Sequence, residues 1–321
     1  MRDALFEVRR GKTLESIHRG RFAVVADSKL IAKKGDVDAP TFVRSAIKPL
    51  QAKAVLDSGA ADAYGFSDQE LAVISGSHYG EDAHVRAVQS ILDKAGLRPD
   101  DLRCGTHAPF SDTQKKRLAR EGSSPTVLHN NCSGKHSGML AAAKKLGAPL
   151  ASYLDPKHPL QRMNLDALAE YSATRRSSIT IATDGCSAPT FALPIRSVAR
   201  VFARFANDND GALARITRAM TAHPEMIGHP CQELMSAVPG KIIGKIGAEG
   251  VYGAAVIRQG LGFALKIEDG SSRGTLPVIV ALLLRHAKWS AAERSALQGL
   301  VKSEVTNHAG LIVGRMRAVI D

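Results

Sequence analysis

The chain has 321 residues, of which 44% are hydrophobic, so it can bury a sizeable core as one large domain or as two joined lobes, and disorder along the whole chain is excluded. It has no apolar run long enough to span a bilayer, and its first residues carry charges where a secretory signal requires an apolar stretch, so we expect a cytoplasmic protein that binds no membrane. The net charge of +12 favours anionic partners, but lysines and arginines are scattered and aromatic residues make up only 5%, which argues against nucleic acid.

The first third of the chain predicts strands and a helix. Two strands, over residues 21–27 and 30–37, flank a short polar turn and predict an antiparallel pair. A helix is predicted from near Ser45, because apolar residues follow at helical spacing and Pro49 is tolerated only in a first turn. The short apolar run over 70–75 predicts a strand that leads into a polar loop.

The rest of the chain alternates between the two element types. In chain order we expect an amphipathic helix ending at Gly96, a strand over 178–183, a helix over 212–222, paired strands over 251–259 and 262–269, and an apolar helix over 275–289. These elements predict a mixed α/β chain. We see no internal repeat and no Pro- or Ser-rich linker, so residues 1–321 are expected to form a single catalytic domain.

The four cysteines are widely spaced along the chain. In a reducing cytosol such thiols are expected to be buried apolar residues or metal ligands rather than disulfides. Cys132 and Cys186 lie on separate loops that are predicted to follow strands, and they are candidates for metal binding. Cys104 and Cys231 lack metal-like spacing and are interpreted as core residues.

A Ser-x-x-Lys pair, Ser45 and Lys48, stands at the start of the predicted helix. Residues three apart on a helix share one face, so an uncharged lysine amine can take the proton of the serine hydroxyl. Backbone amides at a helix N-terminus can stabilise a negative charge that develops on a reacting carbonyl oxygen. The alternative is a capping serine beside a surface lysine.

A second candidate is the loop that contains Ser77 and His78, in which small residues allow a sharp turn and leave hydroxyls exposed. Ser77 is a candidate second nucleophile or proton relay, and the alternative is an ordinary Gly/Ser turn with His78 as a satisfied polar residue. Lys245 lies between apolar residues, where a buried cation needs a partner or must be neutralised.

A third candidate combines Cys132 and Cys186 with the neighbours of the first cysteine, Lys135 and His136. Two cysteines on separate loops can form a zinc site completed by a third protein group and water. By residue type alone His136 is the better third ligand, since imidazole commonly binds zinc and lysine rarely does. The alternative is two buried thiols, because no Cys-x-x-Cys hairpin is present.

Five segments together resemble the rhizobial-type, class 3 L-asparaginases, in the same order and with matching spacing across nearly the whole chain. They are Arg44-Ser45-Ala46-Ile47-Lys48-Pro49, Ser77-His78, Asn131-Cys132-Ser133-Gly134-Lys135-His136, Thr183-Asp184-Gly185-Cys186 and Gly244-Lys245-Ile246-Gly247-Ala248. The resemblance implies an α/β (α+β) fold similar to serine β-lactamases and glutaminases, with an antiparallel-rich sheet flanked by helices, and assembly as a homodimer. The resemblance also favours a functional role for each motif over the structural alternative given above for that motif alone.

The resemblance assigns roles to individual positions. It implies that Ser45 is the nucleophile with Lys48 as its base, and that Ser77 and Lys245 form a second Ser–Lys pair. Family members hold Zn²⁺ through positions that match Cys132, Lys135 and Cys186, which favours Lys135 over His136. The substrate-binding positions expected from the resemblance are Arg44, His78 and Asp184, the last of which is also expected to orient the metal site.

The reaction expected from these roles is hydrolysis of L-asparagine to L-aspartate and ammonia through an acylated serine, with activity highest at alkaline pH because a lysine base must be uncharged. Zinc with two thiolate ligands is expected to position the substrate rather than to activate water. The alternatives are a glutaminase or another Ser–Lys hydrolase related to β-lactamases. A basic zinc-binding module for nucleic acid is the alternative from another class.

Overall fold

The computed structural model describes residues 3–321 and divides the chain into two compact units. Unit 1 consists of Met1–Ala46, Leu193–Asn207 and Glu233–Asp321, and unit 2 consists of Ile47–Ala192 and Asp208–Gln232. Each unit is therefore assembled from segments that are distant in the sequence.

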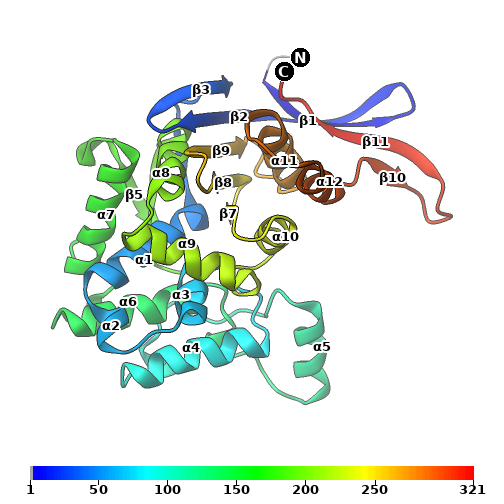
Figure 1. Ribbon diagram of the computed structural model, residues 1–321. Helices are drawn as coiled ribbons and strands as arrows, with labels where there is room; N and C mark the ends of the chain where they lie inside the picture. Colours follow the sequence, from blue (N-terminus) through cyan, green and yellow to red (C-terminus); the bar gives the residue numbers. More distant parts are fainter. Residues whose placement is uncertain (1–2) are drawn as a thin grey trace. The chain divides into compact units, whose positions relative to one another are not determined.

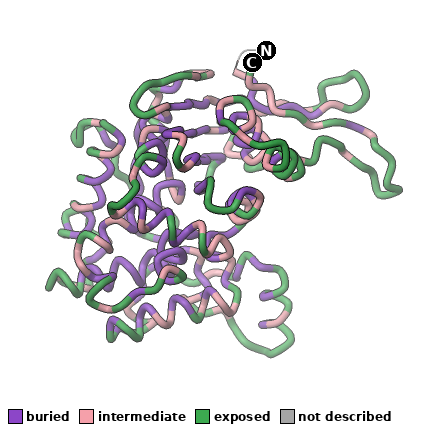
Figure 2. The backbone as a smooth tube through the Cα atoms, viewed as in Figure 1, coloured by how far each residue is buried: buried purple, intermediate pink, exposed green. Residues whose placement is uncertain are grey.

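Unit 1 is built on an antiparallel sheet with strand order β10-β11-β1-β2-β9-β8-β7, and β3 also pairs with β2. The strands of this sheet are β1 (Ala4–Arg10), β2 (Thr13–Ala26), β3 (Lys29–Lys34), β7 (Ile242–Gly247), β8 (Val251–Val256), β9 (Leu261–Ile267), β10 (Glu304–Thr306) and β11 (Ile312–Ala318). The short strand β4 (Pro40–Phe42) lies outside it. The long strand β2 pairs with β1 through its first half and with β3 and β9 through its second half. The tips of the β1–β2 and β10–β11 hairpins are exposed (Figure 2).

Three helices of unit 1 are α8 (Ile195–Asn207), α11 (Thr275–His286) and α12 (Ala291–Gly299), and α10 (Cys231–Ala237) crosses the boundary between the units. Helices α8 and α11 pack on β8 and β9 (Figure 1). Helix α8 buries Phe202 and Phe205 among its apolar face. Burial of each such side chain stabilises the fold by about 1.5–3 kcal/mol.

Unit 2 is mainly helical. Its helices are α1 (Lys48–Asp57), α2 (Ala60–Ala63), α3 (Asp68–Ser75), α4 (Asp82–Lys94), α5 (Asp112–Arg120), α6 (Ser133–Lys145), α7 (Pro159–Ser172) and α9 (Ala212–Ala222). The antiparallel hairpin of β5 (Thr180–Thr183) and most of β6 (Pro189–Pro194) completes it. Its short 3-10 helices are η2 (Pro99–Asp101), η3 (Val127–His129), η4 (Leu150–Ser152), η5 (Arg176–Ser178) and η6 (Pro224–Met226), and η1 (Arg44–Ile47) has its first three residues in unit 1.

Helices α3 and α6 form the centre of unit 2, because α3 packs against α1, α4, α6 and α9, and α6 packs against α1, α3, α4 and α7 (Figure 1). Helix α6 is buried from Ser133 to Ala143. At Gly134 the two helices approach so closely that a Cβ atom would lie 2.4 Å from the carbonyl oxygen of Val73. This contact places the first turn of α6 beside the end of α3.

The prediction of a mixed α/β fold with an antiparallel-rich sheet is confirmed. The predicted strand pairs appear as β2–β3 and β8–β9, and the predicted helix over 212–222 is α9. The helix predicted from near Ser45 begins as the short 3-10 helix η1 and continues as α1, with Pro49 in its first turn. Among residues 3–321, no helix is both long and apolar enough to cross a membrane.

The strand predicted over residues 70–75 is wrong, because this segment belongs to helix α3. All six of its residues are buried, and a short helix that is buried on every side shows the same continuous apolar run as a buried strand. The sequence feature that distinguishes this helix from a strand is the capping box of Ser67 and Glu70, in which each side chain accepts a hydrogen bond from the other residue's backbone N–H.

We predict that Gly134→Ala lowers the free energy of unfolding by about 1–3 kcal/mol, because the added methyl group forces α6 away from the backbone of α3. The matched control is Gly299→Ala, where a Cβ atom meets nothing within 4 Å. Urea denaturation followed by circular dichroism measures both. Equal stability of the two variants would show that α3 and α6 do not pack as closely as described.

Candidate functional site

Ser77 stands in the loop that follows α3, and its backbone is held by a neighbouring segment. The Ser77 N–H donates to the carbonyl oxygen of Ile227 at 3.0 Å. At Gly76 a Cβ atom would lie 2.3 Å from the carbonyl oxygen of Met226, so only glycine allows the two backbones to run this close. Ser77 is half-buried.

Lys48, the first residue of α1, reaches this loop with a side chain that is almost entirely buried. Its Nζ lies 2.9 Å from the carbonyl oxygen of Gly76, 3.2 Å from that of Asn131 and 3.0 Å from Ser77 Oγ. A charged amine donates to all three oxygens. An uncharged amine can keep both bonds to the carbonyls, and its lone pair then faces the Ser77 hydroxyl. This is the arrangement that a general base requires.

The sequence motif pairs Lys48 with Ser45. In the structure, Lys48 is hydrogen-bonded to the hydroxyl of Ser77 instead. Ser45 is half-buried and lies in η1, near the end of the first of the three segments that form unit 1. Its role as nucleophile stays a prediction. The spacing rule for a Ser-x-x-Lys pair assumes a regular α-helix, and here Ser45 precedes the first α-helical turn.

The two predicted metal-binding cysteines meet beside this pair. Cys132 precedes the first turn of α6, Cys186 lies in the turn between β5 and β6, and both are buried. The two thiols are hydrogen-bonded to each other, and Lys135 Nζ donates to Cys186 Sγ at 3.2 Å. The structure therefore brings together Cys132, Lys135 and Cys186, which the sequence proposes as ligands.

The charges of this cluster depend on one another. The hydrogen bond from Cys186 holds the pKa of the Cys132 thiol well below its ordinary value although burial opposes this, and the same bond raises the pKa of Cys186. Burial lowers the pKa of Lys135, but the Cys186 and Cys132 sulfurs outweigh it and raise that pKa above its ordinary value. The two thiols and the Lys135 amine therefore act as one electrostatic group, in which Lys135 contacts Cys186 directly.

His136 does not join the two cysteines. Its Nδ1 lies 2.7 Å from the Tyr153 hydroxyl, and the ring is fully buried, which lowers its pKa well below the ordinary value. Throughout residues 3–321, no three His, Cys, Asp or Glu side chains gather as they would around a metal ion. Lys135 and His136 are consecutive residues of α6, so their side chains point about 100° apart. The amine of Lys135 is the one that reaches the cysteine pair.

His78 has both ring nitrogens engaged by the protein. Gly80 N–H donates to Nδ1 at 3.1 Å, so the proton of the neutral ring is on Nε2, which lies 2.8 Å from Ser133 Oγ. Burial lowers the pKa of His78 well below its ordinary value, and His84, stacked on it, and Lys48 add to this effect. A neutral His78 therefore links the Ser77 loop to the first residue of α6.

The other predicted site residues lie as follows. Asp184 is half-buried in the β5–β6 turn, where its Oδ1 accepts the Gly185 N–H at 2.8 Å. In unit 1, Lys245 is fully buried in β7 and donates to the carbonyl oxygen of Ile246 at 2.7 Å. Arg44 is the first residue of η1 and has a φ of 48°.

The structure also reveals two residues to which the sequence assigns no role. Asn131 accepts a hydrogen bond from Lys48 through its carbonyl oxygen, and its N–H donates to His107 Nε2 at 3.0 Å. Asn131 stands beside Cys132 in a recognisable motif, but a backbone carbonyl has no signature in the sequence. His107 lies in a loop with no recognisable pattern, so no signal pointed to it.

Comparisons with known proteins give one match over almost the whole chain. The sequence profile of the L-asparaginase II family matches residues 6–318. No match is found among curated proteins.

Solved structures give weaker likenesses. The structure of Mglu in its native form is 14% identical with a TM-score of 0.48, over 85% of this chain and 66% of that chain, so this chain spans just under two thirds of Mglu. A putative β-lactamase from Bacteroides dorei is 11% identical with a TM-score of 0.42, over 82% of this chain and 93% of that one. A β-lactamase from Mycobacterium bovis is 12% identical with a TM-score of 0.34, over 88% of this chain and 95% of that one. At these identities and TM-scores we take nothing about activity from them.

Proposed function

The chain belongs to the L-asparaginase II family, and on that premise we propose that it is an L-asparagine amidohydrolase, which hydrolyses the side-chain amide to give L-aspartate and ammonia. The observation that carries the proposal is the contact of Lys48 Nζ with Ser77 Oγ, with two backbone carbonyls bound to the same amine. A buried amine held in this way beside a hydroxyl can activate a serine nucleophile for acyl transfer.

The chemistry of the pair follows from its geometry. Uncharged Lys48 takes the proton of Ser77 Oγ as this oxygen bonds to the amide carbon of the substrate. The lysine ammonium then gives that proton to the leaving nitrogen, the carbon–nitrogen bond breaks and ammonia departs. Water, losing a proton to Lys48, attacks the resulting aspartyl ester and restores the Ser77 hydroxyl. Both half-reactions use the same base in turn.

Two serines compete for the role of nucleophile. The family resemblance favours Ser45, while the hydrogen bond to Lys48 favours Ser77. We propose Ser77 as the hydroxyl that Lys48 activates, and Ser45 as the alternative site of acylation. Lys245 and Arg44, both in unit 1, keep the base and substrate-binding roles that the resemblance suggests.

In unit 2, Asp184 and His78 complete the proposal. Asp184 raises the pKa of Lys135 together with the two cysteines, so a carboxylate lies within electrostatic range of the cluster. We propose that Asp184 attracts the ammonium group of the substrate. His78, with both nitrogens occupied, supports the Ser77 loop, and direct contact with substrate requires it to release Ser133.

We further propose that Cys132, Lys135 and Cys186 hold a zinc ion. Two sulfurs and one nitrogen are a donor set that zinc accepts, with water as the fourth ligand. In a tetrahedral site with ordinary Zn–S and Zn–N lengths, nitrogen and sulfur stand about 3.6 Å apart. Lys135 Nζ is 3.2 Å from Cys186 Sγ, so this pair of atoms would have to separate by about 0.4 Å. A zinc ion held by two thiolates keeps little Lewis acidity, and its chemistry would be to orient the substrate.

Assembly as a homodimer, expected from the resemblance, is part of the proposal, as is a cytoplasmic location. All four cysteines are free thiols in the structure, which is the state that a reducing compartment maintains. Light scattering after size-exclusion chromatography measures the number of subunits.

The first prediction from this proposal concerns substrate and nucleophile. The purified protein releases ammonia from L-asparagine faster than from L-glutamine, and Ser77→Ala reduces kcat by about 10³-fold or more, because the activated hydroxyl is lost. An acyl-enzyme trapped by rapid acid quench and mapped by mass spectrometry carries the aspartyl group on Ser77.

The control for this experiment is Ser75→Ala, a buried neighbour whose hydroxyl donates to the carbonyl oxygen of Leu71 within α3. It should retain activity. Acylation of Ser45 in the wild type, with Ser77→Ala still acylated, would assign the nucleophile to Ser45. Faster release of ammonia from glutamine would make the protein a glutaminase.

The second prediction concerns pH. Since the base acts in its uncharged form and a lysine side chain is ordinarily protonated at neutral pH, kcat for L-asparagine increases from neutral to alkaline pH. Lys48→Arg, which stays charged, abolishes the increase and the activity together. A rate of wild-type turnover that does not vary with pH over this range would contradict a lysine base.

The third prediction concerns the metal. Lys135 and both thiols must lose protons to bind zinc, so binding measured by calorimetry releases protons and tightens as pH rises. Cys186→Ser weakens zinc binding by at least about 100-fold, whereas Cys231→Ser, also buried, leaves it unchanged. A chelator raises KM more than it lowers kcat if zinc orients the substrate. Zinc binding of equal strength in both cysteine variants would exclude this site.

A further inference from the structure

We infer that His107 is a positioning residue for the Ser77–Lys48 pair, acting through Asn131; the inference rests on the proposed function. His107 Nδ1 lies 2.7 Å from the carbonyl oxygen of Ala108, and a nitrogen that faces a carbonyl at this distance carries the proton. In the neutral ring, Nε2 is then an acceptor. The group that it meets is the Asn131 N–H, at 3.0 Å, so donor and acceptor match.

Asn131 passes this constraint to the reacting groups. Its carbonyl oxygen is one of the two that bind the Lys48 amine, at 3.2 Å. The N–H and the carbonyl belong to the two peptide groups that flank the Asn131 Cα, so a shift of Asn131 moves both and changes where the lone pair of Lys48 points and how it contacts Ser77 Oγ. Proton transfer is sensitive to such shifts, because donor and acceptor must stay within about 2.6–3.2 Å of each other.

The Asn131 side chain connects the same two neighbours. Its Oδ1 lies 3.2 Å from His107 Nε2 and 3.5 Å from Cys132 Sγ. A half-turn of the amide replaces Oδ1 by Nδ2 at this point, and Nδ2–H can then donate to both the imidazole nitrogen and the sulfur. Asn131 thus contacts His107 by backbone and by side chain.

His107 is held in place from the solvent side by aromatic rings. It stacks on Phe110, with ring centroids 5.1 Å apart and planes inclined by 22°. Phe110, which is 49% exposed, meets Tyr79 edge to face at 5.7 Å, and the Ser111 N–H donates to the Tyr79 carbonyl oxygen at 3.1 Å. Because Tyr79 lies two residues after Ser77, the ring contacts connect His107 through Phe110 with the loop of the proposed nucleophile.

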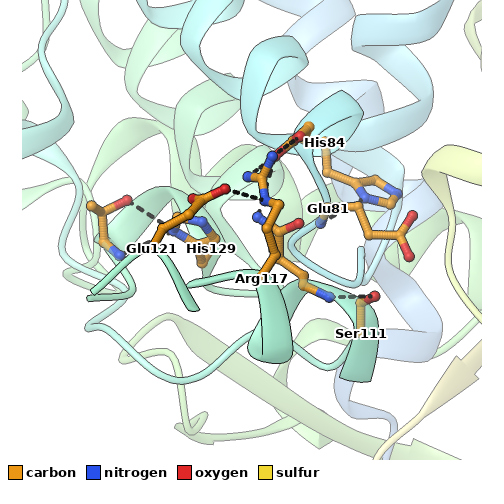
Figure 3. A network of polar contacts seen from close by, with 9 residues as sticks. Glu81, His84, Ser111, Arg117, Glu121 and His129 are labelled. Atoms are coloured by element: carbon orange, nitrogen blue, oxygen red, sulfur yellow. Dashed lines mark hydrogen bonds and ion pairs between the residues drawn. The ribbon is translucent and has the colours of Figure 1, made fainter. Parts of the chain in front are cut away.

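Polar contacts at both ends anchor the loop that carries His107 (residues 105–111). At its start, Asn130 Nδ2 donates to the carbonyl oxygens of Cys104 and Gly105. At its end, Ser111 caps α5, and Arg117 of α5 is paired with Asp82 and with Glu121 (Figure 3). Helix α5 buries only Gln114 and Leu118, so hydrogen bonds and ion pairs, rather than an apolar core, hold this part of the chain.

Three variants test the inference. His107→Phe keeps a ring that can stack on Phe110 but removes the acceptor for the Asn131 N–H. His107→Gln supplies a side-chain oxygen that can accept the same N–H. His308→Phe, at an exposed position in unit 1, is the matched control for replacing histidine by phenylalanine.

With L-asparagine as substrate, we expect His107→Phe to lower kcat by about tenfold while KM changes less than about threefold, as the loss of one positioning hydrogen bond predicts. His107→Gln should recover kcat to within about threefold of wild type, and His308→Phe should equal wild type. A kcat within about twofold of wild type in His107→Phe, or equal losses in the phenylalanine and glutamine variants, overturns the inference.

Hydrogen–deuterium exchange provides a readout that does not depend on the substrate. The Asn131 amide, followed by NMR or in short peptides by mass spectrometry, should exchange faster in His107→Phe than in wild type, and not in His107→Gln or His308→Phe. Unchanged exchange in His107→Phe overturns the inference even if activity falls. If the wild type releases no ammonia from asparagine, the proposed function fails, and the exchange experiment still decides whether His107 holds Asn131.

Discussion

The placement of one buried amine is the constraint on which the described site depends. Lys48, the first residue of α1, is almost fully buried, and its Nζ is bound by backbone carbonyls of the loop after α3 and of the segment before α6 and by the Ser77 hydroxyl. An ammonium group buried without hydrogen bonds is strongly disfavoured, so each of these contacts is needed for the fold as well as for chemistry. The close packing of α3 on α6 at Gly134 brings the segments that carry the two carbonyls together.

Thiols and imidazoles surround the buried amines of unit 2. The hydrogen bond with Cys186 lowers the pKa of Cys132, and the two sulfurs raise the pKa of the Lys135 amine. Burial lowers the pKa values of His78 and His136, and nearby lysines lower them further, so neither ring adds a positive charge. The proposed zinc site uses this same group, because an amine and two thiols release protons when they bind a metal ion.

The sequence predicted most of the fold, and it failed where burial hides periodicity. The pairs β2–β3 and β8–β9 show apolar runs bounded by turn residues, and α9 shows helical spacing with a proline after its end, so local patterns suffice there. Helix α3 was missed because its residues 70–75 are all buried, although the capping box of Ser67 and Glu70 indicates where it starts. The division into two units was beyond the sequence, since each unit combines distant segments without a linker.

By itself the sequence determined which chemical groups this protein has and which family they resemble: the Ser–Lys motif, the cysteine loops and the lysine beside Cys132 are visible as short patterns. Only the tertiary structure decided which groups meet. It bonds Lys48 to Ser77, turns His136 toward Tyr153 instead of toward the cysteines, and brings in Asn131 through a carbonyl that every residue possesses. The physical reason is that spacing along a chain sets neighbours only within one helix or strand, whereas contacts between elements depend on how their faces pack.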